Sequence, residues 1–265
     1  MIDELKIYRL PEIDIIGDAT AHFTEPHFPP GEIPLEESNR RRDQLFQHWE
    51  LYFSHCDLCK KAGVSDDGEH LQKMYPILGA GNRNADIMII GIGPGKDEDE
   101  QRIPFIGRSG QELRKALRQV QGVEMDPSEI YLTNSILCRP YRINKETGFE
   151  NNRDPVALEL QLCRPKLFIT IGLVSPKVII CTGEIPYSNI TGLVDVSVGR
   201  EICRPAIVEY TDWNKQPRRA FLLIMYHPSA VIRMDNDKAK QELFMQGIRK
   251  SLILAVELAK KGVPE

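Results

Sequence analysis

The stretch Ile87-Met88-Ile89-Ile90-Gly91-Ile92-Gly93-Pro94-Gly95 joins an apolar run to a glycine-rich turn. Four consecutive apolar residues that stop at a glycine are typical of a strand buried in a parallel sheet. The glycines and Pro94 then predict a turn at the carboxyl end of that strand, the edge where open α/β sheets bind ligands. We therefore expect Gly91, Ile92 and Gly93 to lie against a substrate.

The turn does not match the common nucleotide-binding motifs. No Gly-Lys-Ser/Thr follows it, which excludes a P-loop, and Pro94 and the acidic run Asp97-Glu98-Asp99 stand where a dinucleotide-binding helix should begin. Taken alone, the glycines also fit an ordinary strand–loop–helix connection. The rest of the chain has to decide between a binding loop and a plain turn.

Strands alternate with helices along most of the remaining chain. Further strands are expected at 131–134, 177–183 and 220–226, and helices at 35–62, 109–120, 155–173 and 238–261. This alternation predicts βαβ units and a parallel sheet. Polar loops are expected at 63–84 and 141–155. The length of 265 residues suits one α/β domain at 51–265 with an N-terminal arm and the start of the first helix at 1–50.

Charge and hydropathy narrow the class of protein. The formal net charge is −4, and the acids concentrate in the first fifty residues, which leaves a weakly basic body. That distribution permits binding to nucleic acid without requiring it. No apolar run reaches the roughly 18 residues of a membrane span, and the start lacks the features of a signal peptide. A cytoplasmic protein is therefore expected.

Cysteine spacing indicates a metal site. In a cytosolic chain disulfides are disfavoured, so Cys56-x-x-Cys59 suggests metal or redox chemistry, and its place after a helix argues against a thioredoxin-like pair. Cys138 and Cys163, each followed by Arg-Pro, add two thiols. Four thiolates suit Zn²⁺ or a [4Fe–4S] cluster, and the spacing is too wide for a zinc ribbon. The alternative is that Cys138 and Cys163 are buried apolar residues.

The motifs together resemble a known family. In chain order they are Gly-x-Gly-Pro-Gly with trailing acids, Pro104-Phe105-Ile106-Gly107-Arg108-Ser109-Gly110, Thr133-Asn134, Cys138-Arg139-Pro140, Asn152-Arg153-x-Pro155, Cys163, Pro176-Lys177-Val178-Ile179 and His227-Pro228-Ser229. This ordered set looks like the iron–sulfur uracil-DNA glycosylases, family 4 of that superfamily, over about residues 50–255.

The resemblance implies a fold, a cofactor and a partner. The fold would be a three-layer αβα arrangement with a central four-stranded parallel sheet, extended at its N-terminus. A structural [4Fe–4S] cluster, with zinc as the alternative, would be held by Cys56, Cys59, Cys138 and Cys163 and would brace the loop carrying Arg139 against DNA. The partner would be DNA containing uracil, bound by a monomer without membrane association.

The resemblance also implies roles in the site. Phe105 would stack on a flipped uracil, Asn134 would pair with its O4 and N3–H, and His227 would donate to O2. Ser229 and Arg233 would bind the substrate, with residues 230–233 entering the minor groove. The plainer alternatives are a core residue for Phe105, a turn cap for Asn134 and a surface charge for Arg233.

Three features depart from the family pattern or limit the chemistry. Ile92 stands where family 4 usually has Glu, which is more like family 5 and its broader base specificity. Glu98 remains, either to orient water or to exclude thymine, and residues 145–150 look inserted. The alternatives are therefore a glycosylase for other deaminated bases and a non-catalytic protein that binds uracil-containing or single-stranded DNA. No lysine is expected in the pocket as a Schiff-base nucleophile, which predicts a monofunctional enzyme without lyase activity.

Overall fold

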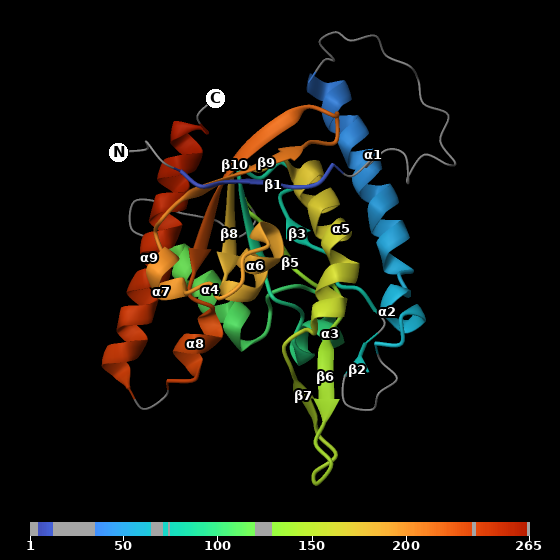
Figure 1. Ribbon diagram of the computed structural model, residues 1–265, viewed down its shortest axis with the longest axis vertical. Coiled ribbons are helices and arrows are strands. Elements are labelled where there is room, and N and C mark those ends of the chain that lie inside the picture. Colours follow the sequence, from blue (N-terminus) through green and yellow to red (C-terminus); the bar gives the residue numbers. More distant parts are fainter. Residues whose placement is uncertain are drawn as a thin grey trace.

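The apolar run at 87–90 forms the centre of a parallel sheet. The computed structural model describes residues 5–12, 35–64, 71–73, 75–119, 129–234 and 237–263. Four parallel strands pair side by side: β10 (Pro217–Met225), β8 (Val178–Thr182), β4 (Ile87–Gly91) and β5 (Tyr131–Asn134). Every residue of β4, β5 and β8 is buried. The predicted four-stranded parallel sheet is confirmed (Figure 1).

Three strands that the sequence did not predict extend this sheet to seven strands. β9 (Ala206–Thr211) pairs antiparallel with β10, and β1 (Ile7–Arg9) joins β9 in parallel. At the other edge, β3 (Ala80–Gly81) pairs antiparallel with β5. The expectation of a plain loop over 63–84 is therefore wrong at β3, because backbone pairing with β5 fixes those two residues as a strand.

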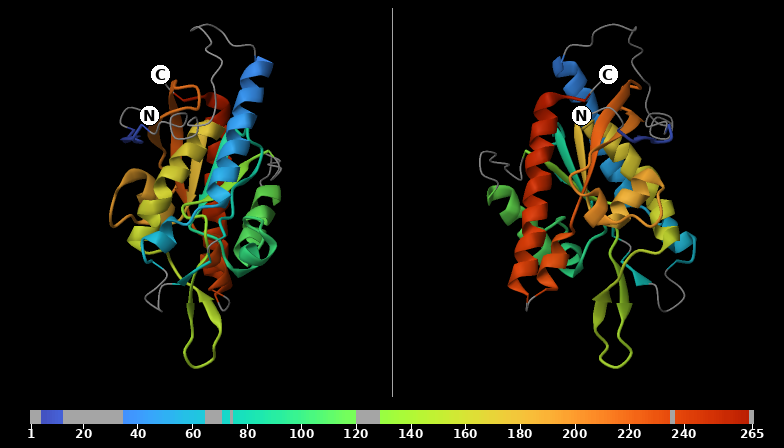
Figure 2. Two further views of the ribbon diagram at one scale, coloured as in Figure 1. Left: turned by 90° about the vertical axis from the view of Figure 1, so that its right-hand side faces the viewer. Right: turned by 60° about the vertical axis from the view of Figure 1, so that its left-hand side comes forward.

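Helices cover both faces of the sheet, as Figures 1 and 2 show. Side chains of a strand alternate between its faces, so Met88 and Ile90 join one buried cluster while Ile87 and Ile89 join the other. The first cluster includes residues of α1 (Leu35–Ser54) and α5 (Ala157–Val174), and the second includes α4 (Arg108–Gln119) and α9 (Lys238–Lys261). The three-layer architecture is thereby confirmed.

Two other expectations need correction. The first helix ends at Ser54, and a short α2 (Leu58–Lys61) follows, so a single helix over 35–62 is wrong. The predicted polar loop at 141–155 instead contains the hairpin of β6 (Pro140–Ile143) and β7 (Glu150–Asn152), which forms a second sheet with β2 (Leu71–Gln72). The remaining helices are α3 (Lys96–Gln101), α6 (Glu184–Thr191), α7 (Val198–Glu201) and α8 (Pro228–Ile232).

The expected N-terminal arm is described only in part. Residues 13–34 lie outside the described residues. The second half of α1 is built into the body, because Phe46 and Trp49 are each 3% exposed in the cluster that also contains α5. Across the described part of the chain, no helix combines the length and the apolar character that crossing a membrane requires.

Candidate active site

A cavity of about 860 Å³ lies at the carboxyl ends of the parallel strands, where Gly91 ends β4 and Asn134 ends β5. This volume is typical of a small-molecule pocket. Nine of the residues that line it are those expected to bind or act on a substrate: Gly91, Ile92, Gly93, Glu98, Phe105, Asn134, His227, Ser229 and Arg233. Loops that are far apart in the sequence therefore converge on one cavity.

Gly91 allows two of these side chains to approach each other. It pairs in register with Asn134, and a Cβ at Gly91 would overlap Asn134 Oδ1 and lie 2.8 Å from Phe105 Cζ. Real Cβ contacts are essentially never this short. Glycine is therefore needed at this position because the Asn134 amide and the Phe105 ring both close over its Cα atom.

Phe105 is held in a strained backbone conformation. Its φ of 58° lies in the left-handed region, which bulky residues rarely adopt. Arg114 Nε donates to its carbonyl oxygen at 3.1 Å, and a Cβ at Gly110 would overlap the same carbonyl. These contacts fix the loop that presents the ring, which is 9% exposed and lines the cavity.

Asn134 offers an unused amide to the cavity. The residue is 5% exposed, and its side chain makes no hydrogen bond with any residue in the described ranges. Buried amides normally have partners in the protein. A turn-capping role would require such a bond, so the arrangement favours an amide kept available for a ligand.

His227 is positioned as a neutral hydrogen-bond donor. It stands at the N-cap of α8, where its Nδ1 accepts from the backbone N–H of Ser229 at 3.1 Å and lies 2.7 Å from the Ser229 hydroxyl. With Nδ1 as an acceptor, the neutral ring carries its proton on Nε2. Burial, and then the Arg233 cation, lower the pKa of His227 to about 4. The imidazole is therefore neutral near pH 7.

Glu98 joins the two loops that form one wall of the cavity. Its Oε2 accepts from the backbone N–H of Gly95 at 3.0 Å, and its Oε1 accepts from that of Gly107 at 2.8 Å. The first contact forms half of a capping box at the start of α3. Each carboxylate oxygen keeps a further lone pair, so Glu98 can both brace the loops and accept a hydrogen bond from water.

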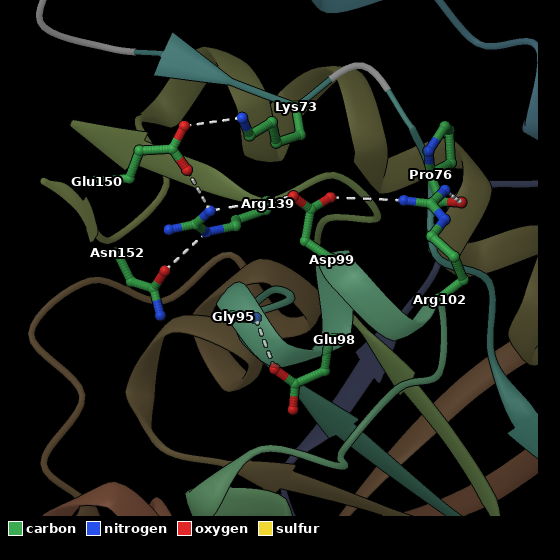
Figure 3. Close-up of polar contacts among 9 residues, drawn as sticks. All are labelled: Lys73, Pro76, Gly95, Glu98, Asp99, Arg102, Arg139, Glu150 and Asn152. Carbon is green, nitrogen blue, oxygen red and sulfur yellow. Dashed lines mark hydrogen bonds and ion pairs between the residues drawn. The ribbon is translucent and has the colours of Figure 1, made fainter. Parts of the chain in front are cut away.

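Arg139 is a buried residue that links the β6–β7 hairpin to α3. It is 1% exposed, and it donates from Nη1 to Glu150 at 2.7 Å and from Nε to Asn152 at 2.8 Å (Figure 3). Asp99 of α3 lies 4.0 Å from the same guanidinium. The charge of Arg139 joins the β6–β7 hairpin to the wall that carries Glu98. Arg139 itself is therefore not exposed on the loop that was expected to lie against DNA.

Sequence reasoning missed other residues around the cavity. Lys96 lines it; its side chain is 60% exposed and its Nζ lies 3.8 Å from Glu100. Nucleophilic lysines are normally desolvated, and this one is not. Tyr226, Arg142 and Asp154 also line the cavity. Tyr226 directly precedes His227-Pro228-Ser229, and this position next to a predicted site motif is the sequence signal that could have identified it.

The four predicted cysteine ligands line one small pocket. Cys59, Cys138 and Cys163 are buried and Cys56 is half-buried. The other residues that line the pocket are Gln72, Pro76, Leu137 and Lys166. The pKa of Cys163 lies below its ordinary value because the Cys59 thiol donates to it. Across the described residues, no group of three or more His, Cys, Asp or Glu side chains has the arrangement that holds a single metal ion.

The pocket has the chemistry that a polar guest would need. Both side-chain polar atoms of Gln72 are buried without a partner in the described structure, at the wall of the cysteine pocket. An unpaired buried amide is costly unless a group that can hydrogen-bond is present. The four thiols therefore fit a group that is bound by thiolates. The unpaired amide of Gln72 fits sulfur atoms that accept a hydrogen bond.

Fold and site together define an α/β enzyme that binds its ligand at the carboxyl edge of a parallel sheet. The family model of the uracil DNA glycosylase superfamily matches residues 78–249. A type-4 uracil-DNA glycosylase of Archaeoglobus fulgidus is 31% identical over 66% of this chain and 78% of its own length. The corresponding proteins of Pyrobaculum aerophilum and Thermotoga maritima are 32% and 28% identical, over 62% and 69% of this chain and 76% and 84% of their own. The chain belongs to the uracil DNA glycosylase superfamily and, within it, to the type-4 uracil-DNA glycosylases.

Gly91→Ala is expected to lower kcat/KM on a uracil-containing oligonucleotide by about 10²-fold, because an error of about 1 Å in placing reactive groups has that cost. The new methyl group displaces either Asn134 or Phe105. Gly199→Ala is the matched control, since its Cβ would meet an ordinary 3.5 Å contact. Equal activity in wild type and Gly91→Ala would show that Asn134 and Phe105 do not need this close approach.

Proposed function

We propose that this uracil-DNA glycosylase flips uracil out of DNA into the 860 Å³ cavity and hydrolyses its N-glycosidic bond. A stacked base cannot reach such a cavity, so flipping is required and costs a few kcal/mol. The observation that carries the proposal is the unused amide of Asn134, which shares one cavity with Phe105 and His227. A flat ring, a two-way hydrogen-bonding group and a neutral donor suit a pyrimidine with two carbonyls.

Phe105 and Asn134 recognise the base. The aromatic ring stacks on the flipped base, which is worth about 1–3 kcal/mol in comparable contacts. The Asn134 amide donates to uracil O4 and accepts from N3–H. Cytosine presents the opposite pattern at these positions, so the same amide discriminates against it.

Bond cleavage leaves negative charge on the departing uracil, around O2. His227 stabilises that charge by donating from Nε2–H, while Ser229 holds the other ring nitrogen and thereby fixes the imidazole. A neutral donor suits this role because it stabilises the anion without a proton having to be taken up beforehand. Arg233, on the same cavity wall, is placed for a phosphate of the DNA strand.

Water completes the reaction by attacking C1′ of a sugar with oxocarbenium character. Glu98 orients that water through the lone pairs that Gly95 and Gly107 leave unused. Ile92 supplies no second carboxylate in the cavity. Its apolar side chain also favours a second candidate, a glycosylase with broader acceptance of deaminated bases. No desolvated lysine lines the described cavity, so we propose a monofunctional enzyme without lyase activity.

The test is a cleavage assay with oligonucleotides that contain uracil, hypoxanthine or a thymine mispair. Release of uracil alone supports the proposal, and release of hypoxanthine or thymine as well supports the broader glycosylase. Binding to uracil-containing DNA without release of any base would overturn the catalytic assignment. Strand cleavage without added alkali would contradict the monofunctional mechanism.

We further propose that Cys56, Cys59, Cys138 and Cys163 hold a [4Fe–4S] cluster. When bound, the cluster would join α2, the loop after β5 and α5 through these cysteines, which would be a structural rather than a catalytic contribution. Cys163→Ser is expected to lower iron and sulfide content, to remove the visible thiolate-to-iron absorption and to reduce the melting temperature. Cys203→Ser, outside this pocket, is the control. A colourless wild-type protein that contains zinc and no iron would overturn the assignment.

A further inference from the structure

The β6–β7 hairpin projects from the body of the protein (Figures 1 and 2). Its strands pair from Tyr141–Asn152 to Ile143–Glu150, and a turn closed by Asn144 and Phe149 joins them. Arg142 and Asn152 of the hairpin line the cavity itself. The hairpin is therefore a continuation of the cavity wall that extends into solvent.

Ion pairs with the buried Arg139 and the part-buried Lys73 hold this hairpin against the body. The Glu150 carboxylate accepts a hydrogen bond from Arg139 at 2.7 Å and another from Lys73, which directly follows β2, at 2.8 Å, as Figure 3 shows. The Tyr141 ring lies beneath both cations, 4.7 Å from Lys73 Nζ and 5.3 Å from the Arg139 guanidinium carbon. Hydrogen bonds between charged groups are among the stronger polar contacts in proteins. The exposed end is thus held in a fixed direction.

The hairpin presents a cation and apolar side chains to solvent. Phe149 is 71% exposed and Ile143 is 47% exposed. The Arg142 guanidinium forms no hydrogen bond or ion pair with any residue that the structure describes. An aromatic ring and an available guanidinium on one arm provide the two kinds of contact that nucleic acids accept, stacking and phosphate binding.

We propose that this hairpin is a DNA-binding arm that contacts the strand beyond the flipped nucleotide, with Arg142 on a phosphate and Phe149 against a base. The inference rests on the proposed function, because the cavity wall that the hairpin extends is the one that receives uracil. Continuity with that wall and the Arg142 cation favour DNA over an apolar protein partner. Contact by the arm adds affinity and sets the length of substrate that the enzyme requires.

The length of the hairpin determines how long a substrate must be to contact it. Asn144, where the turn begins, lies about two residues beyond Arg142, and a strand rises about 3.3 Å per residue, so Phe149, which pairs with Asn144, stands about 7 Å beyond Arg142. Duplex DNA advances about 3.4 Å per base pair, so this distance corresponds to about two base pairs. A trinucleotide with a central uracil is too short to touch Phe149, whereas a duplex with about ten base pairs on each side is long enough.

The experiment compares these two substrates in wild type and in Phe149→Ala. The ratio of kcat/KM on the long duplex to kcat/KM on the trinucleotide is expected to fall about ten-fold in the variant, the loss of one base–aromatic contact. Leu51→Ala on α1, which removes a side chain of similar exposure (64%) outside the cavity, is the matched control. Since Phe149 is exposed, the melting temperature is expected to stay unchanged.

Binding to a duplex that carries 2′-fluoro-deoxyuridine, which resists hydrolysis, gives an independent measurement. Arg142→Gln is expected to reduce the slope of log K against log salt by about 0.9, the value for one phosphate contact. The proposal that the hairpin binds DNA would be overturned if Phe149→Ala bound this duplex with wild-type affinity, or if it lost activity equally on the long and short substrates. If wild type releases no uracil from any substrate, the proposed function fails, while the binding measurement still decides the arm.

Discussion

Replacing His227 with alanine is expected to lower kcat for uracil excision by about 10²–10³-fold, the usual cost of removing one donor to a developing anion. The imidazole is fixed by Ser229 and carries its proton on Nε2, so its donor is preorganised before the bond breaks. Alanine leaves the charge on uracil O2 without this partner. Single-turnover release of uracil from a single-stranded oligonucleotide measures the chemical step directly.

The pH dependence separates this role from general acid catalysis. Because burial lowers the pKa of His227 to about 4, the ring stays neutral between about pH 5 and pH 8. The ratio of the wild-type rate to the His227→Ala rate is therefore expected to be constant over that range. His48→Ala, on α1 and outside the cavity, is the control. A ratio that falls as the pH rises through about 6.5 would instead show that a protonated imidazole is the active form.

The buried sheet could be predicted because its cause is local. Four apolar residues at 87–90 can be satisfied only between two helical layers, and both layers are present. The position of the site followed from the same strands, since parallel strands bring their carboxyl ends to one edge. Gly91, Asn134 and His227 each follow or end such a strand, which is why motifs far apart in the chain meet at one cavity.

The β6–β7 hairpin could not be predicted in this way. Glu150-Asn151-Asn152 has no apolar alternation, and its strand conformation comes from pairing with β6 and from Arg139. The burial of Arg139 depends on partners in another strand, so its position beside a predicted metal ligand gives no sign of it. Glu98 had a readable signal in its spacing from Gly95, typical of a capping box, but the bond to Gly107 depends on how the following loop folds back.

Asn134→Asp is expected to reduce uracil excision on the order of 10³-fold, because a site built to pair with polar groups strongly rejects a mismatch. Aspartate has nearly the shape of asparagine, so the cavity and Gly91 are left undisturbed. An ionised carboxylate only accepts hydrogen bonds, so it keeps the contact with N3–H but places negative charge against uracil O4. Single-turnover excision of uracil and of cytosine from otherwise identical oligonucleotides measures the change.

The ratio of the two rates is more informative than either rate alone. A carboxyl group that carries a proton donates to N3 of cytosine and accepts from its amine, so the preference for uracil over cytosine is expected to fall in Asn134→Asp. Asn214→Asp, on the exposed turn between β9 and β10, makes the same chemical change away from the cavity and controls for added charge. An unchanged uracil rate with an unchanged preference would mean that the free amide of Asn134 does not read the base. Recognition would then have to come from the shape of the cavity around Phe105.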